Sequence, residues 1–159
     1  MERLELLERL ERFEASAGAS RPPQHTSRLI RSARVAHLAT ADKQDQPHVI
    51  PICFVFDGKC FYSPIDEKPK RAAPLKLKRL RNIKENPQVS LVIDHYDENW
   101  SKLGYLLVFG KARILSSGKK HQDAIRLLRR KYWQYRRMAL EQRPMISVTM
   151  TKVVTWGAI

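Results

Sequence analysis

Residues 48–63 read HVIPICFVFDGKCFYS, two apolar runs on either side of the pair Asp57-Gly58. Asp-Gly is among the strongest short signals of a β-hairpin, because both central residues of a type I′ turn need positive φ. The pair predicts antiparallel strands at 48–56 and 59–63, with Phe56 opposite Lys59. One face then shows Ile50, Ile52, Phe54, Phe56 and Phe61, and the other shows Val49, Pro51, Cys53, Val55, Cys60 and Tyr62.

Both faces of this hairpin are apolar, unlike those of an antiparallel hairpin with one side in water. Its second face must therefore be covered by more barrel, by another subunit or by a flat ligand. Outward from the hairpin, apolar alternation predicts four more strands, at 35–40, 88–95, 103–115 and 145–155. Helical spacing predicts helices at 74–86 and 119–137, and an amphipathic helix before the break at 17–23. This order favours a mainly β fold, a small closed barrel of six antiparallel strands over residues 31–159, preceded by a helix and linker over 1–30.

The formal net charge of the 159 residues is +14, and it is concentrated in two segments. Residues 66–84 carry eight Lys or Arg and two acids, and residues 119–137 carry eight and one. Clustered cations focus an electrostatic field over one region of surface, so the distribution predicts a partner with phosphates or carboxylates. A nucleic acid is one such partner, and a phosphorylated cofactor is another.

Several enzyme motifs are missing. The sequence contains no GxGxxG, GxxxxGK[ST], HExxH or GxSxG, so dinucleotide-fold, P-loop, zincin and hydrolase interpretations lose their sequence support. The histidines show no metal-ligand spacing, and two cysteines are too few for a disulfide framework, so no metal is expected. No apolar run approaches the roughly 18 residues of a membrane span, and the start Met1-Glu2-Arg3 is unlike a secretory signal; a cytoplasmic protein is expected.

Two short motifs point to an anion pocket beside an apolar wall. Tyr62-Ser63 ends the second hairpin strand with hydroxyl groups, and Lys78-Arg79 begins a helix shortly after. An arginine can hold a phosphate through two parallel hydrogen bonds, a lysine adds a point charge, and a helix N-terminus adds its unpaired N–H groups.

Three strings extend this interpretation: HVIPICFVFDGKCFYSPIDEKPKR, LKRLRNIKENPQVSLVID and GKAR, in this order. Together they resemble the pyridoxamine 5′-phosphate oxidase-like split-barrel superfamily, within it the branch of deazaflavin (coenzyme F-420)-dependent oxidoreductases, over roughly residues 34–157. The resemblance implies a six-stranded antiparallel split β-barrel with flanking helices. It also implies a homodimer with two cofactor sites between the subunits, which would cover the second face of the hairpin with ligand and partner.

The resemblance implies FMN or coenzyme F-420 as cofactor and suggests the residues that bind it. The strand before the hairpin turn lines the ring, Tyr62 and Ser63 meet the phosphate, and Lys78 and Arg79 grip it, with Lys68 as an addition. The ring-lining residues are Val49, Ile50, Pro51 and Ile52. Trp100 and Tyr105 are candidates for the substrate side of the ring.

The expected function is hydride transfer between the bound cofactor and a small organic substrate, with no catalytic residue required because the cofactor carries the chemistry. Tyr105 stands where pyridoxamine-phosphate oxidases have glutamine, and their C-terminal arginine motif is missing, so vitamin B6 oxidation is not expected. One alternative is a nucleic-acid-binding module that uses residues 119–137, with Tyr132, Trp133 and Tyr135 stacking on bases. Another is a non-catalytic flavin or haem carrier on the same fold.

Overall fold

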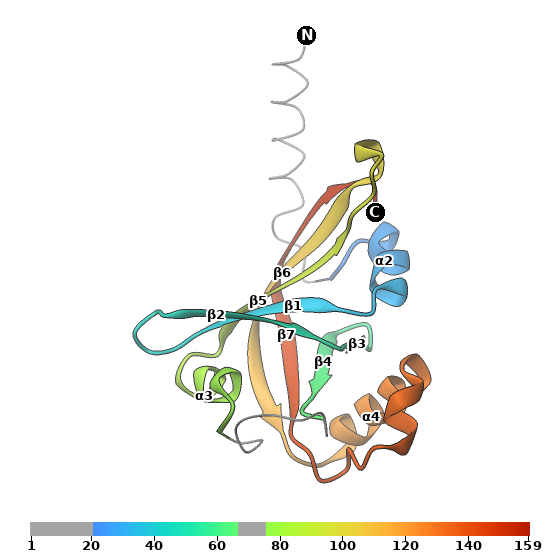
Figure 1. Ribbon diagram of the computed structural model, residues 1–159. Coiled ribbons are helices and arrows are strands. Elements are labelled where there is room, and N and C mark those ends of the chain that lie inside the picture. The colour runs from blue at the N-terminus through green and yellow to red at the C-terminus, as the bar shows by residue number, and fades with distance from the viewer. Residues whose placement is uncertain (1–20, 67–75) are drawn as a thin grey trace.

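The computed structural model describes residues 21–66 and 76–159 of the chain. The described part is mainly β, with one antiparallel sheet and three α-helices (Figure 1). The strands are β1 (Ala36–Ala41), β2 (Pro47–Ile52), β3 (Val55–Phe56), β4 (Cys60–Pro64), β5 (Gln88–His95), β6 (Gly104–Leu115) and β7 (Met145–Gly157). The helices are α2 (Ser27–Ser32), α3 (Lys78–Glu85) and α4 (Lys119–Lys131), with 3₁₀ turns η1 (Gln24–Thr26), η3 (Trp100–Lys102) and η4 (Trp133–Arg137).

The sheet curls because one stretch of chain supplies both of its edges. Its strand order is β2-β1-β5-β6-β7-β4-β3, so β2 and β3 lie at opposite ends of the sheet. Only Cys53 and Phe54 separate these two strands in the chain. The strand expected over 48–56 is therefore broken there, and the sheet has seven strands instead of six. The split-barrel fold is confirmed (Figure 1).

The expected pairing of Phe56 with Lys59 is wrong by two residues, because Phe56 pairs with Phe61. The connection is longer than a two-residue turn: the Asp57 carboxylate accepts hydrogen bonds from the backbone N–H groups of Lys59 and Cys60, both at 2.8 Å. Side chains alternate with a period of two along a strand, so the shift keeps each one on its expected face.

The first apolar face of the strands fills the barrel interior. Leu38, Leu91 and Leu106 are completely buried in one cluster with side chains from every long strand. The pair β6 and β7 runs the length of the sheet and approaches closely at Gly110, where a Cβ atom would lie 2.5 Å from the Thr149 carbonyl oxygen. Gly110 is thus required by the close spacing of the two strands.

Helix α4 covers part of the second face of the hairpin. The outward side chains of β3 and β4 pack against Ile125 and Leu128 in a second buried cluster. The expectation that ligand and partner cover this face is therefore wrong for β3 and β4, and only Val49 and Pro51 on β2 are left exposed. The helix expected over 119–137 is also interrupted: α4 ends at Lys131, Tyr132 is extended, and η4 follows.

Two further helices contribute side chains to the interior cluster. Leu77 has an extended backbone, so α3 begins at Lys78 and not at Pro74, which lies outside the described residues. Helix α2 was not expected, and its Leu29 and Ile30 join the interior cluster. The amphipathic helix expected before residue 17, and Lys68, also lie outside the described residues. No helix of the described ranges has the length and apolar character needed to cross a membrane.

Candidate functional site

Strand β2 presents an apolar surface and a free backbone edge. It pairs only with β1 among the described strands, so the N–H and C=O groups on its other edge are available to a ligand. The Val49 side chain is 60% exposed and Pro51 is exposed beside it, while Ile50 and Ile52 pack toward the interior cluster. Of the four predicted ring-lining residues, Val49 and Pro51 can therefore contact a ligand with their side chains. Ile50 and Ile52 can contact it only with their backbone groups.

The predicted cations Lys78 and Arg79 do stand at the start of α3, but they differ in their electrostatic state. Lys78 Nζ donates to Asp42 Oδ2 at 2.5 Å, and Asp42 Oδ1 also accepts from the backbone N–H groups of Gln44 and Gln46 at 3.0 Å each. The hydrogen bond from Lys78 is the largest of the effects that hold the pKa of Asp42 below its usual value. The charge of Lys78 is thus balanced within the protein.

Arg79 is the cation without such a balance. Its Nε atom is buried and has no hydrogen-bond partner among the described residues. Burial lowers the pKa of Arg79, and the nearby Asp66 carboxylate opposes this only in part. A desolvated guanidinium of this kind favours an anionic ligand, since an anion would satisfy both its charge and its donors.

His48, which the sequence analysis did not select, belongs to the same cluster. Its Nδ1 atom is buried without a hydrogen-bond partner in the described residues. Burial, followed by the charges of Arg79 and Lys78, lowers the pKa of His48. We refer to His48, Lys78 and Arg79 as the anion cluster. The only sequence signal for His48 was its position directly before the predicted ring-lining residues.

The side chains of Tyr62 and Ser63 do not act as a unit within this chain. Successive side chains of β4 point to opposite sides, and the Tyr62 hydroxyl donates to Asp57 Oδ2 at 2.8 Å in the hairpin connection. Burial and the Asp57 hydrogen bond raise the pKa of Tyr62. Ser63 is buried on the other side of the strand. The Tyr62 hydroxyl is therefore already engaged within its own hairpin.

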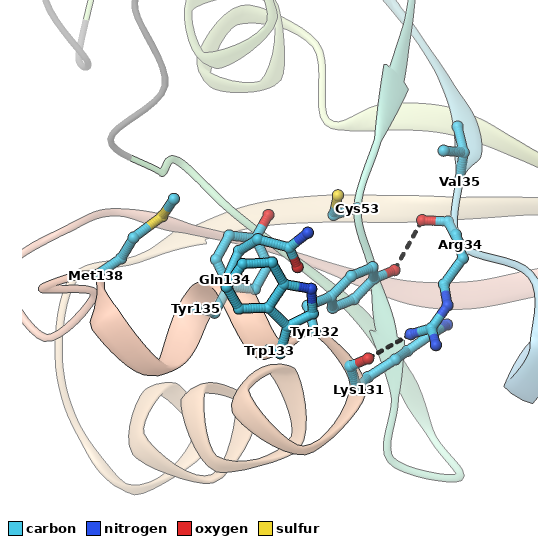
Figure 2. A pocket seen from close by; sticks show the side chains of 9 residues that line it. All are labelled: Arg34, Val35, Cys53, Lys131, Tyr132, Trp133, Gln134, Tyr135 and Met138. Atoms are coloured by element: carbon cyan, nitrogen blue, oxygen red, sulfur yellow. Dashed lines mark hydrogen bonds between the residues drawn. The ribbon is translucent and has the colours of Figure 1, made fainter.

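A cavity of about 410 Å³ opens where β2 ends, and sequence reasoning missed it (Figure 2). Two cations stand at its wall: Lys131 Nζ lies 3.7 Å from the centroid of the Phe54 ring, and an Arg34 Nη1 group donates to the Lys131 carbonyl. Burial and then the charge of Arg34 lower the pKa of Lys131 to about 8. The lining residues are Arg34, Val35, Cys53, Lys131, Tyr132, Trp133, Gln134, Tyr135 and Met138.

Two buried tyrosines hold this cavity in place. The Tyr132 hydroxyl accepts from the Phe54 N–H group at 3.0 Å and lies 2.8 Å from the Arg34 carbonyl, to which it donates. The Tyr135 hydroxyl donates to Asp66 Oδ2 at 2.9 Å. Because Asp66 also faces Arg79, one carboxylate connects the cavity wall with the anion cluster. Burial of both tyrosine rings leaves Trp133, 63% exposed, as the only one of the three proposed base-stacking aromatics open to solvent.

Trp100 and Tyr105 lie away from these features. Trp100, 74% exposed, is in the short helix between β5 and β6, at the end of the sheet opposite α3 (Figure 1). The Tyr105 ring stacks on Trp156, with centroids 5.8 Å apart. Within the chain the structure therefore does not bring this pair to the anion cluster. Among residues 21–66 and 76–159, no three His, Cys, Asp or Glu side chains gather as a metal site would require.

Comparison with known proteins agrees with this architecture. A family model of pyridoxamine 5′-phosphate oxidase matches residues 22–157. The chain belongs to the pyridoxamine 5′-phosphate oxidase family, which confirms the resemblance seen in the sequence. A search of the curated proteins finds no match.

Solved structures share the fold at low sequence identity. A conserved hypothetical protein from Mycobacterium tuberculosis is 16% identical, with a TM-score of 0.68 over 88% of each chain. HutZ, the haem storage protein from Vibrio cholerae, is 16% identical, with a TM-score of 0.66 over 86% of this chain and 97% of that one. An F-420 reductase is 23% identical, with a TM-score of 0.59 over 83% of this chain and 97% of that one. Likeness at these identities shows the fold alone.

Proposed function

We propose that this protein is an oxidoreductase that binds FMN or coenzyme F-420 and transfers a hydride between that cofactor and a small organic substrate. The observation that carries the proposal is the position of β2. This edge strand begins at the anion cluster, continues through the exposed side chains of Val49 and Pro51, and ends at the cavity beside Cys53.

The residues present fit a phosphorylated ring cofactor. From His48 to Cys53 the strand direction covers about 16 Å at roughly 3.3 Å per residue, which suits a ligand with a phosphate at one end and a ring at the other. Arg79 would bind the phosphate, because its buried Nε has no partner among the described residues. Val49 and Pro51 would contact the ring face, and backbone groups of the free β2 edge would hydrogen-bond to ring heteroatoms. The bound cofactor would supply the hydride chemistry.

The cavity beside β2 is the proposed substrate site, in place of Trp100 and Tyr105. Neither Arg34 nor Lys131 forms an ion pair with a carboxylate of the described residues, so both can face a negatively charged substrate group. The exposed Trp133 would cover an aromatic part of the substrate. These side chains bind and orient the substrate and exclude water from the ring, and the protein need supply no acid or base.

We further propose a homodimer formed through the outer face of the sheet. This face carries apolar side chains that no described element covers, and Phe109 at its centre is 39% exposed, with polar His37, Ser90, Asp94 and Lys152 on the same face. Its apolar side chains include Ala39, Val49, Pro51, Val92, Tyr105, Leu107 and Phe109. Because Val49 and Pro51 belong to it, a second copy would enclose the cofactor ring. Phe109→Glu should then lower the molar mass in light scattering from dimer to monomer, whereas exposed Trp133→Glu should not.

The decisive experiment is an absorption and fluorescence spectrum of freshly purified protein, followed by titration with FMN, F-420 and riboflavin. We expect FMN or F-420 to bind more tightly than riboflavin, because only they carry a phosphate. If neither exceeds riboflavin, the proposed cofactor site is wrong. A Soret band with no redox turnover would favour the haem carrier. Binding of arbitrary DNA that weakens steeply with salt would favour the nucleic-acid module.

A further inference from the structure

Two buried nitrogen atoms of the anion cluster lack hydrogen-bond partners among the described residues. They are His48 Nδ1 on β2 and Arg79 Nε on α3, and neither finds an acceptor or donor within the described ranges. They come from elements far apart in the chain, yet the charge of Arg79 acts on the His48 imidazole. Buried polar groups are normally paired, so two unpaired nitrogen atoms in one cluster call for an explanation. One anion that accepts hydrogen bonds from both side chains would satisfy them together.

Burial and the charges around His48 disfavour its protonated form in the cofactor-free protein. Helix α3 contributes Lys78 and Arg79, which both disfavour an imidazolium. The loop after β1 contributes Asp42, which is engaged by Lys78, and the segment after β4 contributes Asp66, which faces Arg79. The neighbouring strand β1 carries one titratable side chain, His37, which is opposite Pro51 and not His48, and which lies 3.9 Å from Asp94. The described surroundings therefore contain cations that repel a proton from His48 and no carboxylate paired with it.

We propose that His48 couples the binding of the cofactor's phosphate to the uptake of one proton, so that cofactor affinity rises as pH falls. The proposal rests on the proposed function, because it assigns a phosphate to the anion cluster. A phosphate beside Arg79 reverses the local potential. The imidazolium then gains a counter-ion, and its Nδ1–H group can donate to a phosphate oxygen.

The direction in which pH changes the cofactor affinity follows from the difference between the His48 pKa in the free protein and its pKa in the complex. Burial and the two cations hold the pKa of His48 below its ordinary value in the free protein. A phosphate raises that pKa in the complex, so the complex holds a proton that the free protein has lost. Between the two pKa values, each unit of decreasing pH strengthens binding by up to about tenfold. Below the free-protein value both states are protonated, and this contribution becomes constant.

The test measures the dissociation constants of FMN and F-420 between about pH 5 and 8 for wild type and His48→Gln. Glutamine keeps a polar side chain but does not titrate. FMN also titrates, since a phosphate monoester has a second pKa of about 6, and in the wild-type complex it would titrate together with His48, so F-420, with a phosphodiester, gives the simpler comparison. We expect the wild-type affinity to fall with rising pH by up to about tenfold per unit more than that of the variant. Riboflavin, and the control His95→Gln at the far end of β5, should show no such difference.

Calorimetry of wild type in two buffers of different ionisation enthalpy gives a readout that needs no variant. Net uptake approaching one proton on binding F-420, whose phosphodiester does not titrate in this range, would support the coupling. Parallel pH profiles for wild type and H48Q, or binding without proton uptake, would overturn it while leaving the cofactor site intact. Absence of any phosphate-dependent binding would instead overturn the proposed function.

Discussion

Replacing Arg79 by methionine should stabilise the cofactor-free protein while weakening cofactor binding. The variant keeps an unbranched apolar side chain but removes the guanidinium, whose buried Nε has no partner in the described structure. An unsatisfied buried polar group costs about 1–3 kcal/mol. Asp66 loses a favourable charge, but it keeps the hydrogen bond from Tyr135. We therefore expect a gain near the lower limit, about 1 kcal/mol, or roughly 2–4 °C in Tm for a domain of this size.

The same change should reduce the affinity for FMN. Hydrogen bonds to charged groups contribute about 1.5–3 kcal/mol, which corresponds to a roughly 10- to 150-fold increase in Kd. Riboflavin binding should not change, because riboflavin carries no phosphate. Differential scanning calorimetry without ligand and fluorescence titration with both ligands measure the two effects. The matched control is Arg81→Met, an exposed arginine on the same helix. A Tm that falls in R79M, with an unchanged ratio of FMN to riboflavin affinity, would refute the reasoning and make Arg79 a structural residue.

Three other changes test the framework around the site. Tyr132→Phe removes the acceptor of the buried Phe54 N–H group and should cost about 1–3 kcal/mol in urea unfolding, against no measurable change for an exposed tyrosine. Gly110→Ala should destabilise the protein by at least about 1–3 kcal/mol, because its Cβ would lie 2.5 Å from the Thr149 carbonyl oxygen; an unchanged Tm would mean that β6 and β7 lie further apart. Lys131→Met should flatten the pH dependence of stability between about 8 and 10.5. The folded protein loses the lysine proton near the lower value and the unfolded chain near the higher, so wild-type stability rises with pH across this interval relative to the variant.

The elements of the fold could largely be predicted because hydrophobic periodicity is a local property. The strand β5 was expected with the observed bounds, Gln88–His95, from the alternation of apolar residues alone. Local signals failed where a side chain reorganises the backbone. The Asp57 carboxylate lengthens the hairpin connection by binding two backbone N–H groups, and the Tyr132 hydroxyl binds Phe54 where α4 and η4 separate.

The candidate site could be predicted only in part. The position of Lys78 and Arg79 at the start of a helix follows from nearby residues, and in the structure α3 begins at Lys78. The difference in charge pairing between Lys78 and Arg79 could not be predicted in this way, because the carboxylate that neutralises Lys78 is Asp42, 36 positions earlier in the chain. The cavity likewise combines Arg34, Cys53 and the segment from Lys131 to Met138, which no local pattern connects.

By itself the sequence determined the mainly β class, the alternating faces of most strands and the two concentrations of positive charge. These depend on neighbours within a few positions, and side-chain period and charge are visible there. Only the tertiary structure decided that α4 covers β3 and β4, that β2 becomes an edge, and that one buried nitrogen atom each of Arg79 and His48 lacks a partner among the described residues. Desolvation and charge pairing act through space, so they follow from how distant segments pack and not from the order of residues along the chain.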